Sequence, residues 1–107
     1  MKNVLIICAG GMSSSVLAKK STEFLKEKGN DIQVDATSTN EGQKMIEKGK
    51  YDLFLVSPQT KTYYKQLKDK GDRYGYPVVN IPPQAYVPIP MGIEKLSNLI
   101  LQELPES

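Results

Sequence analysis

The residues Val4-Leu5-Ile6-Ile7 form an apolar run that leads directly into Cys8, the only cysteine of the chain. A segment rich in glycine and serine follows, Ala9-Gly10-Gly11-Met12-Ser13-Ser14-Ser15, and a helical pattern starts near Val16. This order predicts a buried strand, then a loop, then a helix whose N-terminus lies beside the cysteine. The free amides and the dipole of a helix N-terminus bind anions and favour the thiolate form of a nearby cysteine. The segment therefore predicts a site that combines a nucleophile with a phosphate-binding loop.

A lone cysteine at the end of an apolar strand can also be a small buried side chain with no chemical role. The two glycines and three serines after Cys8 favour the chemical interpretation, because packing alone does not require them. Glycines let a backbone approach a ligand closely, and serines cap helices or donate hydrogen bonds to phosphate oxygens.

The length of 107 residues predicts a single domain, 1–107, with one core. The net charge of +2 is too small to indicate a nucleic-acid partner, and no apolar run approaches the roughly 20 residues of a membrane-spanning helix. The first residues lack the apolar core and cleavage site of a signal peptide, and a single cysteine forms no internal disulfide. We therefore expect a cytoplasmic protein that does not insert into the membrane.

The chain contains no histidine. Cys-His and Ser-His catalysis within this chain are therefore excluded, and so are histidine metal ligands. Any phosphohistidine or imidazole base that the chemistry needs has to come from a partner protein.

Strand-like and helical patterns alternate along the chain. The expected strands are residues 2–7, 31–38, 52–57 and 77–81. Glycines at positions 29 and 49 are typical of helix ends, and the expected helices are residues 13–28, 41–48, 60–70 and 93–104. A proline-rich stretch at 82–90 separates the last strand from the last helix.

The apolar pattern of each strand predicts its place in the sheet. Runs 4–7 and 53–56 are apolar throughout, as in strands covered on both faces of a parallel sheet. The strand at 31–38 alternates, and the short strand at 77–81 starts with a proline, so both are expected at edges. With right-handed crossovers, these positions predict an α/β fold with a small flavodoxin-like sheet, strand order 2-1-3-4, and helices on both faces.

Such a sheet has its switch point between strands one and three, at their C-terminal ends, where these folds bind ligands. Cys8 follows strand one there, and Ser57-Pro58-Gln59 ends strand three beside it. The topology therefore predicts the same site as the cysteine segment.

Several chemistries use such a site, and the residues favour one of them. A cysteine phosphatase needs an arginine six residues after the cysteine, but that position is Ser14, and the first arginine is Arg73. Such phosphatases also use an Asp-Pro pair to protonate the leaving group, and the chain has none. Arsenate reduction normally needs further cysteines. Flavodoxins bind the flavin phosphate in a loop without a cysteine and have five strands, whereas four strands are expected here. A phosphoryl carrier, which binds phosphate through neutral amides and hydroxyls, fits the segment best.

The segment from Val4 to Ser15 resembles the signature of the enzyme IIB component of the bacterial phosphotransferase system (PTS), in the lactose/cellobiose/chitobiose group. The family pattern is an apolar strand followed by Cys-x-x-Gly-Met-Ser-[Ser/Thr]-Ser, which matches at Cys8, Gly11, Met12, Ser13 and Ser15. The segment Ser57-Pro58-Gln59 resembles the Gly-Pro-Gln element of the family, with serine in place of glycine.

The resemblance implies a phosphotransferase. A IIA protein would transfer a phosphoryl group from phosphohistidine to Cys8, and Cys8 would pass it to a disaccharide such as cellobiose, chitobiose or lactose on a membrane IIC permease. Residues 9–15 would hold the phosphoryl group, with Pro58 and Gln59 at the rim of the site. The resemblance implies no cofactor and no metal, and we expect a monomer.

Two alternatives stay open: a regulatory interaction module with the IIB fold, and a hydrolase like the low-molecular-weight phosphatases. Three sets of residues are candidate partner contacts, although each is also compatible with ordinary core or surface. They are Met12, the apolar residues Tyr86, Val87 and Ile89 of the proline-rich stretch, and the basic residues Lys61, Lys65, Lys68, Lys70 and Arg73.

Overall fold

The computed structural model of the chain describes residues 2–8 and 13–104. It contains one four-stranded parallel sheet with the order β2-β1-β3-β4, as the sequence predicts. The strands are β1 (Lys2–Cys8), β2 (Ile32–Ser38), β3 (Leu53–Val56) and β4 (Val78–Asn80). The helices are α1 (Ser13–Glu27), α2 (Thr39–Lys48), α3 (Lys61–Tyr74) and α4 (Pro90–Glu103), with short 3₁₀ turns η1 (Pro58–Thr60) and η2 (Pro83–Ala85).

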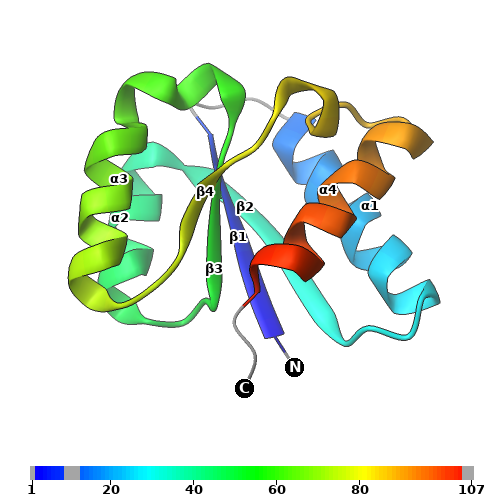
Figure 1. The fold of residues 1–107 in the computed structure, drawn as a ribbon, viewed down its shortest axis with the longest axis horizontal. Coiled ribbons are helices and arrows are strands. Elements are labelled where there is room, and N and C mark those ends of the chain that lie inside the picture. Colours follow the sequence, from blue (N-terminus) through cyan, green and yellow to red (C-terminus); the bar gives the residue numbers. More distant parts are fainter. Residues whose placement is uncertain (1, 9–12, 105–107) are drawn as a thin grey trace.

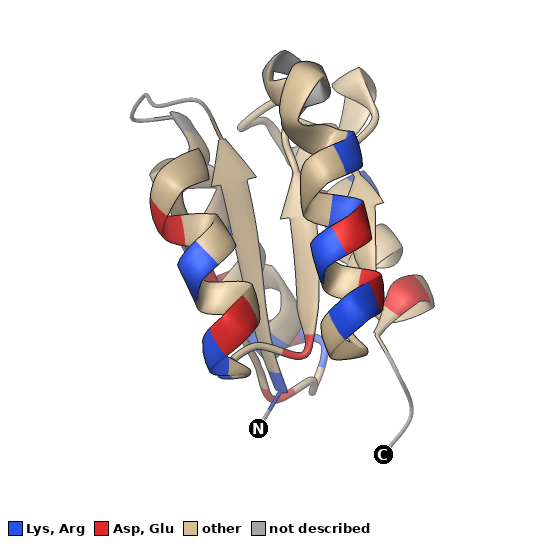
Figure 2. Cartoon of the chain, turned by 90° about the vertical axis from the view of Figure 1, so that its left-hand side faces the viewer, with Lys and Arg blue, Asp and Glu red and all other residues tan. Residues whose placement is uncertain are grey.

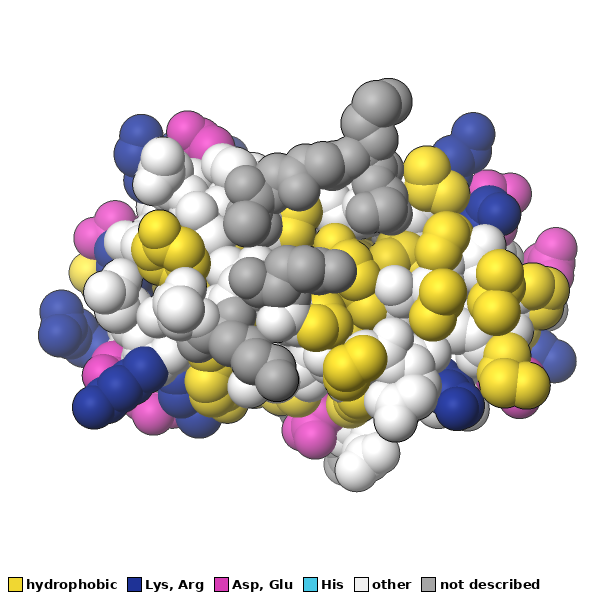
Figure 3. Space-filling view, turned by 90° about the horizontal axis from the view of Figure 1, so that it is seen from above, with side chains coloured by type: hydrophobic (Ala, Val, Ile, Leu, Met, Phe, Trp, Pro, Cys, Tyr) yellow, Lys and Arg dark blue, Asp and Glu magenta, His cyan; other side chains and the backbone are white. Residues whose placement is uncertain are grey.

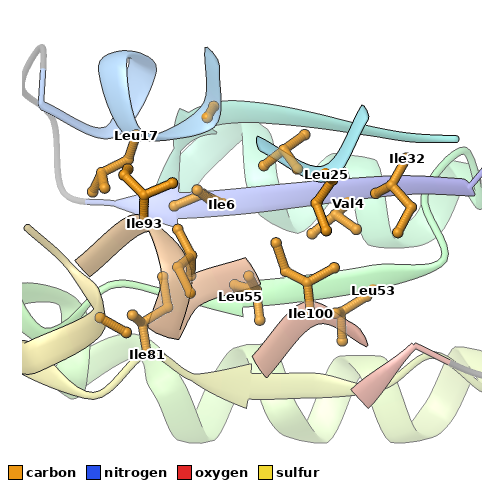
Figure 4. Packing of buried hydrophobic residues seen from close by; sticks show 14 residues of the cluster. Val4, Ile6, Leu17, Leu25, Ile32, Leu53, Leu55, Ile81, Ile93 and Ile100 are labelled. Carbon is orange, nitrogen blue, oxygen red and sulfur yellow. The ribbon is translucent and has the colours of Figure 1, made fainter. Parts of the chain in front are cut away.

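The helices form a layer on each face of the sheet, with α1 and α4 on one face and α2 and α3 on the other (Figure 1). Side chains of β1 alternate between these layers, because successive residues of a strand point to opposite faces. Val4 and Ile6 belong to the core under α1 and α4, whereas Leu5 and Ile7 belong to the core under α2 and α3. Figure 4 shows the first core, in which strand side chains meet Leu17, Leu25, Ile93 and Ile100.

All four strands run in the same direction, so their C-terminal ends lie at one edge of the sheet. Each strand is followed by a helix that runs back along the sheet, and the four helices therefore begin near this edge (Figure 1). The edge collects the positive ends of four helix dipoles. The fold thus places the end of β1 in an environment that suits an anion.

Two helix boundaries differ from the sequence prediction by three residues or more. The helix expected to stop at residue 70 continues through Gly71 to Tyr74. It ends at Gly75, whose φ of 84° is the left-handed conformation that glycine adopts readily. The last helix begins at Pro90 rather than at residue 93, because proline has no amide hydrogen to satisfy and is well tolerated in the first turn of a helix.

Replacing Gly71 with alanine is expected to lower the free energy of unfolding by up to about 2 kcal/mol. Alanine favours a helix over glycine by roughly 1 kcal/mol, but a Cβ at this position would collide with Val78 and lie 2.8 Å from the Tyr76 carbonyl oxygen. Overpacking of this kind costs roughly 1–3 kcal/mol. Urea unfolding monitored by circular dichroism measures the change, with Asp69→Ala on the exposed surface of α3 as the control. A more stable Gly71→Ala variant would contradict the close packing of α3 on β4.

Candidate active site at the end of strand one

Cys8 is the last residue of β1 and is buried, with 4% of its surface exposed. Its position in the alternation of β1 is that of Val4 and Ile6, which face α1 and α4. The thiol therefore lies on the face of the sheet that α1 covers, close to the N-terminal turn of that helix.

Ser14 contacts the thiol directly. It lies in the first turn of α1 and is buried, and its Oγ is 3.0 Å from the Sγ of Cys8. Either atom can be the donor while the cysteine is protonated, whereas a thiolate accepts the hydrogen bond from the hydroxyl. The contact fixes the sulfur beside the helix N-terminus, where a negative charge is stabilised.

The chain directly after β3 lies next to Cys8 across the sheet. The Ser57 amide donates to the Ile7 carbonyl oxygen at 3.0 Å, which continues the register Ile6↔Leu55 and Ile7↔Val56 by one residue. Ser57 is thus the neighbour of Cys8 on the adjacent strand. Its Oγ lies 2.5 Å from the Oγ1 of Thr60, and both side chains are completely buried.

The candidate site residues fall into three groups. Residues 9–12, which include Ala9, Gly10, Gly11 and Met12, lie outside the described residues. Ser13 starts α1, Ser14 reaches the thiol, and Ser15 is exposed beside a groove between α1 and β2. Pro58 and Gln59 form η1, directly after the residue that pairs with Cys8.

The sequence pattern did not indicate a role for Thr60 or for the Ser57 side chain. Thr60 occupies the N-cap position of α3, but its hydroxyl makes no capping hydrogen bond and contacts Ser57 instead. By contrast, Ser38 caps α2 in the usual way, accepting from the Glu41 amide at 3.4 Å. The spacing Ser-x-x-Thr after a buried strand was the only signal in the sequence, and it also fits an ordinary helix cap.

Among the described residues, the polar side chain in contact with the thiol is the neutral Ser14 hydroxyl at the start of α1. Across the described ranges 2–8 and 13–104, no group of histidine, cysteine, aspartate or glutamate side chains has the arrangement of a metal site. Hydroxyl and amide donors at helix N-termini are suited to phosphate. The described part of the site therefore fits an anion next to a nucleophilic sulfur.

The surface around this edge is apolar on one side. Figure 3 views the edge from above, with apolar side chains over the α1 and α4 half and charged side chains at the periphery. Four large apolar side chains are exposed in α1, in the proline-rich stretch 82–90 and in the first turn of α4, namely Val16, Val87, Ile89 and Met91, and they are named the exposed apolar patch. A grouped set of exposed apolar side chains next to a reactive site is typical of a protein-docking surface.

The basic surface expected on α3 is partly neutralised. Lys68 contacts Asp72 at 2.9 Å, and Lys70 contacts Glu47 of α2 at 3.3 Å. Figure 2 shows basic and acidic residues interspersed on the helices that face the viewer from the α2 and α3 side. The hydrogen bond to Asp72 raises the pKa of Lys68 above its ordinary value.

None of the helices in the described ranges combines the length and hydropathy that a bilayer crossing requires.

Comparison with known proteins gives one consistent family. The model of the PTS lactose/cellobiose-specific IIB subunit matches residues 3–98. A PTS oligo-beta-mannoside-specific EIIB component of Bacillus subtilis is 29% identical over 86 residues, which are 80% of this chain and 82% of that protein. A PTS lactose-specific EIICB component of Staphylococcus aureus is 33% identical over 73 residues, which are 68% of this chain and 12% of that protein.

Solved structures agree on the fold. The lactose-specific IIB component domain from Streptococcus pneumoniae superposes with a TM-score of 0.81 at 24% identity, covering 95% of this chain and 96% of that chain. The cellobiose-specific IIB component from Borrelia burgdorferi gives a TM-score of 0.73 at 24% identity, covering 96% and 91%. The two neighbours therefore support the observed layers and strand order.

Proposed function

The chain belongs to the lactose/cellobiose-specific IIB family of the sugar phosphotransferase system, and from this membership we propose that it accepts a phosphoryl group on Cys8 and passes it to a sugar. The observation that supports the assignment most directly is the buried contact between the Cys8 sulfur and the Ser14 hydroxyl at the start of α1. This contact places the only sulfur nucleophile of the chain beside a helix N-terminus.

The proposed transfer has two in-line displacements. In the first, the Cys8 thiolate attacks the phosphorus of a donor phosphohistidine, so that the sulfur–phosphorus bond forms and the nitrogen–phosphorus bond breaks. In the second, a sugar hydroxyl attacks the same phosphorus, the sulfur leaves as thiolate, and the hydroxyl proton is lost to a base outside this chain. Negative charge builds up on the three equatorial oxygens in each step. The amides of residues 9–15 and the Ser14 hydroxyl are the proposed donors to those oxygens.

The same donors explain why the group would be passed on rather than hydrolysed. A phosphatase grips the phosphoryl group with arginine and protonates the leaving group with an acid, whereas position 14 is serine and the chain has no Asp-Pro pair. Neutral donors stabilise the phosphocysteine without activating water. Pro58 and Gln59 of η1 are the proposed rim opposite α1.

The proposed partners are a IIA protein, which supplies phosphohistidine, and a membrane IIC permease, which holds the sugar. Relatives named EIICB components support the second partner, and this chain spans 12% to 14% of the length of those from Streptococcus mutans and Lacticaseibacillus casei. The names of the relatives and solved neighbours favour a disaccharide or short oligosaccharide as the acceptor. We propose that the chain works in the cytoplasm as a single domain, 1–107, and as a monomer, with no cofactor or metal and no nucleic-acid partner.

We propose that both partners dock on the exposed apolar patch Val16, Val87, Ile89 and Met91, because both have to reach the same sulfur. Met91 is the most exposed member, at 65%, and methionine adapts to different partner surfaces. The basic residues of α3 are weaker candidates, since Lys68 and Lys70 are already paired with carboxylates of this chain.

Intact mass spectrometry tests the phosphoryl transfer. After incubation with phosphoenolpyruvate, enzyme I, HPr and a cognate IIA, the protein is expected to gain about 80 Da, the mass of one phosphoryl group. The gain should require IIA and should be absent after Cys8 has been alkylated with iodoacetamide, which modifies the single thiol of the chain.

A protein that gains no mass with a competent IIA would contradict phosphoryl carriage and favour a regulatory interaction module. Release of phosphate from an aryl phosphate by the isolated protein would instead favour a hydrolase. Both measurements use the same preparation, so the three activities can be compared directly.

A further inference from the structure

We propose that Ser57 is a second hydroxyl donor to the anion held at Cys8, and that Thr60 orients it. The proposal deepens the proposed function and rests on it in one respect, namely that Cys8 is the residue that becomes phosphorylated. It starts from the position of Ser57, which is the direct neighbour of Cys8 across the β1–β3 ladder.

The register decides on which face the Ser57 side chain lies. Leu53 and Leu55 of β3 pack in the core under α1 and α4, and Ser57 follows them in the same alternation. Cys8 follows Val4 and Ile6 in the same way. The two side chains therefore lie on the same face of neighbouring parallel strands, which are separated by roughly 4.8 Å.

This placement brings two buried hydroxyls to the same face of the sheet as the Cys8 sulfur. Ser14 of α1 contacts the sulfur at 3.0 Å, and Ser57, the residue directly after β3, is the neighbour of Cys8 in the register of the two strands. Ser57 and Thr60 are each completely buried and are hydrogen bonded to one another at 2.5 Å. A buried hydroxyl pair of this kind has a fixed geometry, because neither group can exchange its partner for bulk water.

The protons of the pair determine what it can do. Two hydroxyls carry two protons, and one proton is used in the bond between them. If Thr60 donates to Ser57, the Ser57 proton is free to be donated to an acceptor at Cys8. An anion there favours this orientation, because a hydrogen bond to a charged acceptor is stronger than a neutral one, and the chain Thr60 to Ser57 to anion is polarised cooperatively.

The assignment also explains a local departure from expectation. Thr60 makes no side-chain cap for its own helix and contacts Ser57 instead. Thr60 is therefore the positioning residue for Ser57.

The test uses inorganic phosphate as the probe and needs no partner protein. Phosphate is expected to slow alkylation of Cys8 by iodoacetamide, and the concentration that gives half-protection measures its binding. A hydrogen bond to a charged group strengthens binding substantially, so Ser57→Ala should raise the phosphate concentration for half-protection roughly tenfold. Thr60→Val should raise it severalfold, and the conservative Thr60→Ser, which keeps the hydroxyl, should restore protection.

The matched control is Ser97→Ala. Ser97 is also a completely buried serine, on α4, and its Oγ has no hydrogen-bond partner within the described part of the chain. This variant should leave phosphate protection unchanged. Because Ser57→Ala strands the Thr60 hydroxyl, the double variant Ser57→Ala/Thr60→Val removes both polar groups and keeps the test valid if the single variant folds poorly.

Unchanged protection in Ser57→Ala, or an equal loss in Ser97→Ala, would overturn the proposal, as would a wild-type protein that phosphate does not protect. The phosphoryl-gain measurement separates this failure from failure of the proposed function. If wild-type protein gains about 80 Da while Ser57→Ala binds phosphate normally, carriage stands and the Ser57 role falls. If no mass is gained while protection still depends on Ser57, the anion site stands and carriage falls.

Discussion

Replacing Cys8 with serine is expected to reduce transfer of phosphoryl groups to sugar by roughly 10³-fold or more. A serine hydroxyl needs an adjacent base to become nucleophilic, and the chain contains no histidine to provide one. The amides at the start of a helix bind an anion, but they cannot ionise an alcohol without a base. The measurement is the rate of sugar phosphate formation in membranes that contain the permease, with enzyme I, HPr and IIA supplied in excess.

The loss should reflect chemistry rather than unfolding. A serine at position 8 keeps a hydrogen-bonding atom next to the Ser14 hydroxyl, which lies 3.0 Å from the sulfur. The free energy of unfolding should therefore change by less than about 1.5 kcal/mol, the usual range for a buried substitution that nearly conserves side-chain volume and keeps its hydrogen bond. Ser14→Ala is the matched control, because it removes the partner but keeps the nucleophile, and it should lose only about tenfold in rate. Sugar phosphorylation at the wild-type rate by Cys8→Ser would contradict the proposed role of Cys8.

The strand order could be predicted because it depends on the apolar pattern of each strand, which can be read directly from the sequence. The apolar runs 4–7 and 53–56 indicated central strands, and β1 and β3 are indeed paired with each other in the middle of the sheet. The helix ends were harder, because glycine has two uses. Gly71 lies inside α3, where only a residue without a Cβ fits against β4, whereas Gly75 ends the helix with a positive φ.

The candidate site could be predicted only as far as local sequence determines it. The Cys8 segment gave the nucleophile and the helix start, but the three serines were equivalent until packing separated buried Ser14 from exposed Ser15. The contact between Ser57 and Thr60 depends on how β3 ends and α3 begins. It also depends on the register of β3 against β1, which no single segment encodes. The long-range part of the site therefore required the structure.

Phe54→Ala is expected to lower the free energy of unfolding by about 3–5 kcal/mol, the usual cost of removing a fully buried aromatic ring. Phe54 is completely buried in β3, and its ring makes edge contacts with Tyr51 and Tyr76, each with 6.0 Å between ring centroids. Such contacts add to the stabilisation from burial alone. Because a domain of this size has a total stability of roughly 5–15 kcal/mol, urea unfolding should show a large fall in the midpoint.

The other phenylalanine of the chain provides the matched control. Phe24 is only partly buried, at a surface groove between α1 and α4, so Phe24→Ala should cost clearly less than Phe54→Ala. Equal losses in the two variants would contradict the central position of β3. The loss of stability in Phe54→Ala should also disturb the geometry around Cys8, because β3 keeps Ser57 in register with Cys8 through the hydrogen bond from the Ser57 amide to the Ile7 carbonyl oxygen. A Phe54→Ala protein that remains folded should therefore show weaker phosphate protection of Cys8, whereas Phe24→Ala should protect normally.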